Sequence, residues 1–229
     1  MAKKKKKLNV RKLFVFILFL YLFFAFIYTL IKMPIKNIII TGNTLVKDYE
    51  IIEAAAIKDY PAILTLKTRK IKRELESMPL IKSAEIKRNL KFQLKINITE
   101  NKIVCLYKST DKYLLDDGST LDNNKTYEGI PTLINYTPED ILKDFLSGLG
   151  TLDYGTIGGI SEISYSPAVN EKNETIDATR FILKMNDGII VYVNTAKINL
   201  LKQYQKIYAS LEDKKGILHL DSGGYLEVK

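Results

Sequence analysis

The side chains in this sequence that are suited to catalysis or metal binding are few and far apart. His219 is the only histidine, and it alternates with Leu218 and Leu220 on a predicted strand, so its side chain is expected to point to solvent. No Ser-His-Asp set can be assembled around it from spacing. Cys105, the only cysteine, lies in the run IVCLY, which is typical of a buried strand. A single cysteine excludes an internal disulfide and a cysteine-based zinc site.

The acidic pairs and the glycines also fit structural roles better than chemical ones. Asp116-Asp117 and Asp187-Gly188 have the composition of tight turns. The segment from Asp117 to Asp122 has too few oxygen ligands in register to hold calcium. The glycines at 148, 150, 155, 158 and 159 form no dinucleotide or phosphate loop, and they are expected to mark a flexible connection. The sequence therefore predicts a protein that is not an enzyme, with no catalytic residues, no metal, no cofactor and no small-molecule substrate.

A long apolar run near the N-terminus organises the rest of the chain. Leu13–Ile31 contains no charged residue, glycine or proline, and as a helix it would span about 28 Å, close to the thickness of a bilayer core. Seven Lys and Arg precede it within residues 1–12, whereas only Lys32 follows closely. Because positive flanks stay cytoplasmic, the prediction is a cytoplasmic tail at 1–12, a transmembrane helix at 13–32 and external domains after it.

A cleaved signal peptide and nucleic-acid binding are the two alternatives to this interpretation of the N-terminal region. A cleaved signal peptide has a shorter apolar core and a small-x-small cleavage site, which Met33-Pro-Ile-Lys36 does not supply. Nucleic-acid binding would explain the formal charge of +9, but past Lys32 the remaining 27 Lys and Arg nearly balance 26 Asp and Glu. The excess charge thus belongs to the membrane flank, and no nucleic-acid partner is predicted.

Strand and helix patterns alternate directly after the apolar run. Apolar residues recur at every second position on one face of Lys91–Thr99, at Phe92, Leu94, Ile96 and Ile98. The expected elements are a strand at 36–41, helices at 47–57 and 69–77, and strands at 82–89 and 91–99. The alternation predicts a sheet with one solvated face and both helices on the other.

This order and spacing resemble a POTRA domain, a β-α-α-β-β module. The resemblance rests on the string IIITGN and on a later Pro-x-apolar-x-x-Ala-x-apolar-x-Arg segment, formed by Pro79, Ile81, Ala84, Ile86 and Arg88. A basic tail, one membrane span and a single POTRA module together resemble the FtsQ/DivIB family of bacterial cell-division proteins. The prolines that the family often carries around the long strand are missing from Arg88-Asn-Leu-Lys91 and Glu100-Asn-Lys-Ile103.

The second half of the chain is dominated by strands and resembles the β domain of the same family. Turns at Asp117-Gly118 and Asn186-Asp187-Gly188 predict two hairpins. Helices are expected from Thr137 to Leu149 and at 198–211, and a final strand pair at 217–220 and 225–228. The fold class is therefore α+β, with a transmembrane helix, a POTRA domain at 34–107 and a mixed, strand-rich β domain at 108–229.

The resemblance implies a non-catalytic scaffold of the divisome that acts during septum formation. In the family, FtsB/DivIC-type and FtsL-type partners add a strand to the edge of the β domain. The strand at Gly224–Val228 is expected to provide that edge, because nothing in the sequence follows to cover it. By local match, the implied partner-binding residues are Leu220, Ser222, Gly223, Tyr225 and Val228.

Further partners follow from the same resemblance, and two alternative functions stand beside it. Other divisome components are expected to bind the POTRA module around Lys82–Asn89, and the protein is expected at the division septum of the cell membrane. A POTRA-containing component for polypeptide handling or transport is the alternative function, which repeated POTRA modules or a barrel would favour. An anchored cell-wall enzyme is a third, which a convergent catalytic constellation would favour.

Overall fold

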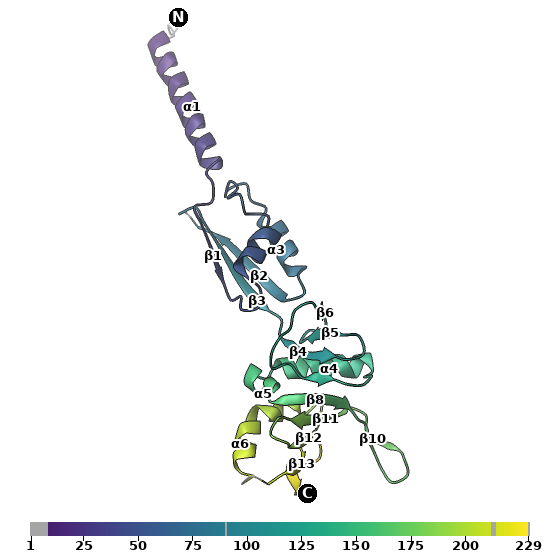
Figure 1. Ribbon diagram of the computed structural model, residues 1–229. Coiled ribbons are helices and arrows are strands. Elements are labelled where there is room, and N and C mark those ends of the chain that lie inside the picture. The colour runs from purple at the N-terminus through teal and green to yellow at the C-terminus, as the bar shows by residue number, and fades with distance from the viewer. Residues whose placement is uncertain (1–8, 90, 212–213, 229) are drawn as a thin grey trace, which may run out of the picture. The chain divides into compact units, whose positions relative to one another are not determined.

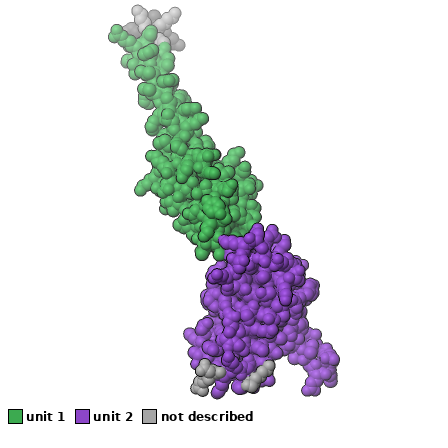
Figure 2. Space-filling model, in the orientation of Figure 1, with its two compact units in different colours: residues 1–100 green, residues 101–229 purple. Residues whose placement is uncertain are grey.

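The computed structural model describes residues 9–89, 91–211 and 214–228, which fall into two compact units, residues 1–100 and 101–229 (Figure 2). The first unit begins with helix α1 (Val10–Ile31), in which no residue is buried. Among the described residues, α1 is the one helix long and apolar enough to cross a membrane. Most of the predicted basic tail, residues 1–8, lies outside the described residues, as do Leu90 and Lys229.

The remainder of the first unit is a three-stranded sheet covered by two helices (Figure 1). Its elements are β1 (Asn37–Thr41), α2 (Asp48–Ala54), α3 (Thr68–Glu76), β2 (Ile81–Arg88) and β3 (Gln93–Glu100). The central strand β3 pairs parallel with β1 and antiparallel with β2. Leu94, Ile96 and Ile98 are buried against the helices, which confirms the predicted alternation and the β-α-α-β-β fold. Phe92 departs from it, because its positive φ of 56° places it in the turn before the strand.

A glycine in the first unit explains part of the string IIITGN. Gly42 has a φ of +85°, and a Cβ at this position would overlap the backbone carbonyl oxygen of Ile98. Glycine both adopts this conformation without strain and permits the close approach to β3. The chain can therefore leave β1 and reach α2 by a short route.

The boundary between the units lies earlier than the predicted 107/108. Glu100 still belongs to the first unit, because its carboxylate accepts hydrogen bonds from the Leu45 and Val46 N–H groups at 2.9 and 2.8 Å. Two residues later, the Lys102 ammonium donates to the carbonyls of Gly150 and Leu152 at 2.8 and 2.7 Å, inside the second unit. Residues 103–107, expected in the POTRA domain, instead form a strand of the second sheet, since buried residues there find their pairing partners.

The second unit is built on one mixed sheet of nine strands, in the order β14-β13-β12-β11-β8-β7-β4-β5-β6 (Figure 1). In chain order its strands are β4 (Ile103–Tyr107), β5 (Lys112–Leu115), β6 (Thr120–Asp122), β7 (Thr132–Leu133), β8 (Ile160–Tyr165), β11 (Arg180–Met185), β12 (Ile190–Asn194), β13 (Gly216–His219) and β14 (Tyr225–Val228). The predicted hairpins around Asp117-Gly118 and Asn186-Asp187-Gly188 are confirmed by antiparallel pairing. Parallel pairs join β4 to β7, β7 to β8 and β12 to β13.

Helices of the second unit supply one side of its core. They are α4 (Glu139–Gly150), α5 (Tyr154–Gly158), the 3₁₀ helix η1 (Ile198–Gln203) and α6 (Tyr204–Ala209). Phe145 of α4 stacks on Phe181 of β11 with ring centroids 3.7 Å apart, in the middle of the buried cluster. The predicted helix at 198–211 is thus split, with a 3₁₀ segment before the α-helical one.

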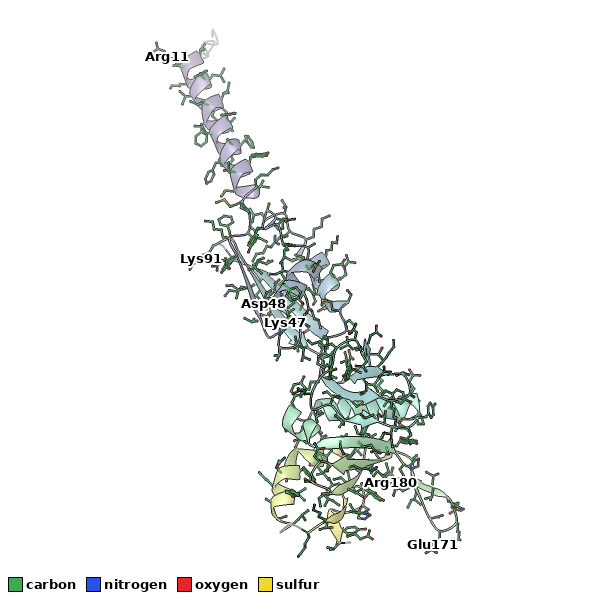
Figure 3. All side chains as sticks on the ribbon, viewed as in Figure 1. Arg11, Lys47, Asp48, Lys91, Glu171 and Arg180 are labelled. Atoms are coloured by element: carbon green, nitrogen blue, oxygen red, sulfur yellow. The ribbon has the colours of Figure 1, made fainter. Side chains whose placement is uncertain are left out.

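Two features of the second unit are missing from the sequence predictions. Helix α5 occupies part of the expected flexible connection, and Asp153 caps it by accepting hydrogen bonds from the Thr156 N–H and hydroxyl, both at 2.8 Å. These hydrogen bonds lower the pKa of the Asp153 carboxyl. Strands β9 (Ala168–Val169) and β10 (Thr175–Asp177) form a hairpin that projects from the sheet (Figure 1), with Glu171 near its tip (Figure 3).

Cys105 lies on β4 with no exposed surface, and burial raises the pKa of its thiol to about 12. We therefore expect the folded protein to resist thiol-modifying reagents at pH 8, because the thiolate is the reactive form. Full reaction is expected only in denaturant, as measured by mass spectrometry after timed exposure. Rapid modification of the native protein would contradict the burial of β4. The Cys105 thiol ionises at a higher pH in the folded protein than in the unfolded chain. Its ionisation therefore favours unfolding as the pH rises above about 9.

Candidate partner-binding edge

Strand β14 forms one edge of the nine-stranded sheet. It pairs antiparallel with β13, from Gly216 opposite Val228 to His219 opposite Tyr225. Among the described residues no strand pairs with its outer side. Backbone N–H and C=O groups on such an edge can accept an extended segment of another chain. The edge of the second unit that the sequence prediction requires is therefore present.

A glycine on β13 allows β14 to lie at this edge. A Cβ at Gly216 would overlap the carbonyl oxygen of Glu227 and come within 3.0 Å of the Val228 Cα. These contacts involve backbone atoms, which cannot rotate away as a flexible side chain can. Sequence reasoning missed Gly216, because only the paired structure shows which backbone lies opposite.

The turn between β13 and β14 is tied firmly to the neighbouring strand. The N–H groups of Leu220 and Asp221 both donate to the carbonyl of Tyr192, at 2.8 and 3.0 Å. The Lys197 ammonium donates to the Asp221 carbonyl at 2.6 Å, and the Gly224 N–H returns to the His219 carbonyl at 2.7 Å. These hydrogen bonds position the turn and, with it, the start of the edge strand.

The five predicted contact residues differ in their accessibility. Tyr225 and Val228 present exposed side chains, at 53% and 60%. Ser222 and Gly223 are exposed in the turn. Leu220 is only 3% exposed and belongs to the hydrophobic core, so its side chain supports the turn and does not face a partner.

His219 does not point freely to solvent as predicted, since its side chain is only 14% exposed. Its ring stacks on Tyr225 at 4.6 Å between centroids and meets the edge of Tyr192 at 5.1 Å. Its Nε2 lies 3.1 Å from Glu227 Oε2. The Arg180 guanidinium lies 4.9 Å from the centre of the Tyr192 ring and continues this row. The row lies on the face of the sheet opposite the core, where the His219 ring packs against Tyr225 of the edge strand.

Asp117 and Asp187, which the sequence places in turns, accept hydrogen bonds that stabilise those turns. Asp117 accepts hydrogen bonds from the Ser119 N–H and hydroxyl at 2.8 and 2.6 Å and from the Asn101 side chain at 2.8 Å. Asp187 accepts from the Ile189 N–H at 3.0 Å and from the Tyr204 hydroxyl at 2.8 Å. Across the described ranges, no three His, Cys, Asp or Glu residues converge on a metal-sized site.

The described residues thus combine an apolar N-terminal helix, a three-stranded sheet covered by two helices, and a strand-rich unit with an open edge. Comparison with known proteins identifies this combination. Residues 33–101 match the family model "POTRA domain, FtsQ-type". The chain is 32% identical over 202 residues to the cell division protein DivIB of Bacillus subtilis (strain 168), covering 84% of this chain and 73% of that protein. The chain belongs to the DivIB/FtsQ family of cell division proteins, which are non-catalytic.

Two further relatives extend the comparison. The chain is 29% identical over 202 residues to DivIB of Staphylococcus aureus (strain NCTC 8325 / PS 47), covering 85% of this chain but only 44% of that longer protein. The solved extracytoplasmic domain of DivIB from Geobacillus stearothermophilus aligns with 50% of this chain and 96% of its own, at 25% identity and a TM-score of 0.39. Helix α1 is consistent with a single-pass anchor in such a membrane protein.

Proposed function

We propose that this protein is a membrane-anchored scaffold of the divisome that binds FtsB/DivIC-type and FtsL-type partners by strand addition at β14 during septum formation. The observation that carries the proposal is the open outer side of β14, held in place by its turn. An added strand would gain main-chain hydrogen bonds along β14, and the exposed side chains of Tyr225 and Val228 would supply specificity.

The topology of the anchor is part of this proposal. Residues 1–12 lie in the cytoplasm. The POTRA fold and the β domain of residues 101–229 lie on the external side of the membrane, where the β domain meets its partners. The asymmetry of Lys and Arg around α1 supports this orientation. Confinement of both partners to one membrane raises their effective concentration, so a modest edge interaction suffices. Other divisome components would bind the POTRA module, whose strand β2 is also an edge.

Capture of a partner by the full chain in nanodiscs tests the edge. We expect the double variant Y225S/V228S to bind the external segment of a DivIC/FtsB-type protein about tenfold more weakly, a loss of ~1.4 kcal/mol, because both exposed anchors are removed. The matched control V169S/I176S removes two exposed apolar side chains from the β9–β10 hairpin, and it should bind like the natural chain. Binding would be measured by surface plasmon resonance.

Removal of β14 itself gives a stricter form of the same test. A chain that ends at Leu220 should show no capture, since the turn and edge strand are absent. If this shortened chain folds and binds the partner as well as the intact chain, strand addition at β14 is wrong. A fluorescent fusion distributed evenly around dividing cells would argue against action at the septum.

A further inference from the structure

The segment that directly follows α1 is bonded to two loops of the POTRA fold. The Ile63 N–H donates to the Met33 carbonyl at 3.1 Å, and the Ile35 N–H donates to the Pro61 carbonyl at 3.1 Å. The Lys36 N–H donates to the Phe92 carbonyl at 2.8 Å. The loop at 58–67 and the turn residues Asn89, Lys91 and Phe92 therefore lie at the end of the POTRA fold where the chain leaves α1.

Chain connectivity places this end close to any membrane that α1 crosses. Met33 follows the last helical residue, Ile31, by two positions. From the ~3.8 Å spacing of successive Cα atoms and about 5.5 Å between the Cα atoms of a hydrogen-bonded pair, Leu64 lies within about 17 Å of the end of the helix. The headgroup layer occupies the first several Å beyond the hydrocarbon core. Leu30 of α1 lines one surface hollow together with Leu64 and Phe92, so both loops lie beside the end of the helix and within reach of lipid headgroups.

Basic residues dominate the segments that meet at this end. Segments 32–37, 57–70 and 87–95 contain ten Lys and Arg but one acidic residue, Asp59. A surface hollow brings several of these residues together with an exposed leucine, and its lining residues are Leu64, Arg88, Asn89, Lys91, Gln93 and Lys95. The Arg88 guanidinium fixes the loop beside it by donating to the carbonyls of Ile63 and Leu64, both at 3.2 Å.

The opposite end of the POTRA fold has a different character. Glu100 ends β3 there, and Asp48 and Glu50 lie in the first turn of α2. Figure 3 shows Lys91 and Asp48 toward opposite ends of the three-stranded sheet. Charge in this module is therefore separated along the strands, with the positive end next to α1.

Exposed apolar side chains accompany the basic residues. Tyr60 is 49% exposed and Leu64 is 53% exposed, and both belong to the loop that is bonded to Met33 and Ile35. Basic residues interspersed with exposed aromatic and aliphatic ones are the composition of surfaces that rest in a membrane interface. The charges attract phosphate, and the apolar side chains enter the boundary between headgroups and acyl chains.

We propose that this end of the POTRA module, here termed the proximal surface (Lys36, Lys58, Tyr60, Leu64, Lys67, Arg69, Lys70, Arg88, Lys91 and Lys95), docks on anionic phospholipid headgroups of the outer leaflet. In cells this rests on the proposed external location of the module. Docking holds the POTRA module against the bilayer, so that α1 is not the only contact with the membrane. A folded external domain is compatible with this charge, because long external segments translocate largely regardless of it.

The test uses the full chain in nanodiscs, where both membrane faces are accessible. An environment-sensitive fluorophore on Thr65→Cys reports the proximal surface, and the same fluorophore on Ser83→Cys reports the far part of β2. Buried Cys105 remains unlabelled. On replacing phosphatidylcholine by a mixture with phosphatidylglycerol, we expect a blue shift at position 65 that high salt reverses, and none at position 83.

Charge variants make the test specific. In the variant R69Q/K70Q/K91Q, the ratio of docked to released protein should fall about fivefold for each removed cation. The matched control K108Q/K172Q/K206Q removes three exposed lysines of the second unit and should behave like the natural chain. Leu64→Ser should weaken the shift without changing its salt dependence.

Two results would overturn the inference. The first is an equal signal at position 65 in neutral and anionic nanodiscs. The second is an unchanged signal in the triple variant. Neither result bears on capture of the division partner, which depends on β14 and is measured separately. Conversely, loss of partner binding in Y225S/V228S with normal docking would leave this inference intact.

Discussion

Replacing Gly216 by alanine is expected to displace β14 from the sheet and to weaken partner capture by at least about tenfold. The added Cβ would overlap the carbonyl oxygen of Glu227, and the backbone of β14 must move to relieve the overlap. The parallel pairing of β13 with β12 does not involve this contact, so the remainder of the sheet should persist.

Hydrogen exchange and binding together measure this effect. Amides of β13 that bond to β14 should exchange faster in Gly216→Ala, while those of β11 and β12 keep their protection. The control is Gly155→Ala, whose new Cβ would approach only the Asp153 carboxylate, at 3.1 Å. If Gly216→Ala captures the partner with unchanged affinity, an ordered β14 is not needed for binding.

The second large effect is expected on stability. Phe145→Ala should lower the free energy of unfolding of the second unit by about 3–5 kcal/mol, since a fully buried aromatic ring is removed. Phe145 stacks on Phe181 at 3.7 Å between ring centroids with an interplanar angle of 13°, so the substitution leaves a cavity and an unpaired ring. This core lies beneath β11 and β12, the strands that support the partner-binding edge.

Denaturant unfolding followed by tyrosine fluorescence measures this loss. Leu200→Ala serves as the control, because Leu200 is 42% exposed and its truncation should cost only about 0.5 kcal/mol. A similar loss of unfolding free energy in Phe145→Ala and Leu200→Ala would show that Phe145 is not central to the core. The first unit should unfold at the same denaturant concentration in all three chains, because Phe145 has no part in its core.

Local patterns predicted the elements more successfully than their partners. Alternation at Leu94, Ile96 and Ile98 and the turn at Asp187-Gly188 specify short-range geometry, and both predictions are confirmed. The sequence predicts a buried strand at 103–107, but the predicted bounds of the POTRA domain include it, whereas in the structure it pairs within the second unit. Its apolar side chains satisfy either sheet, and the choice depends on pairing with β5 and with the distant β7.

The candidate site likewise combines features that local sequence predicts with features that depend on distant residues. An edge strand near Tyr225 and a turn at Ser222-Gly223 follow from turn residues and flanking strand residues. The burial of Leu220, the stacking of His219 between two tyrosines and the close approach at Gly216 depend on strands that are distant in sequence. Period-two alternation assigns residues to two faces, but it does not reveal what covers each face.

By itself, the sequence determined the membrane-length apolar helix, the order of strands and helices and membership of a cell-division family, because each depends on composition or on neighbours along the chain. Only the tertiary structure decided which sheet residues 103–107 join, that Gly216 lies against the backbone of β14 and that the loop at 58–67 and Phe92 meet beside the end of α1. These arrangements come from backbone hydrogen bonds between distant residues, whose pairing is selected by the packed fold as a whole.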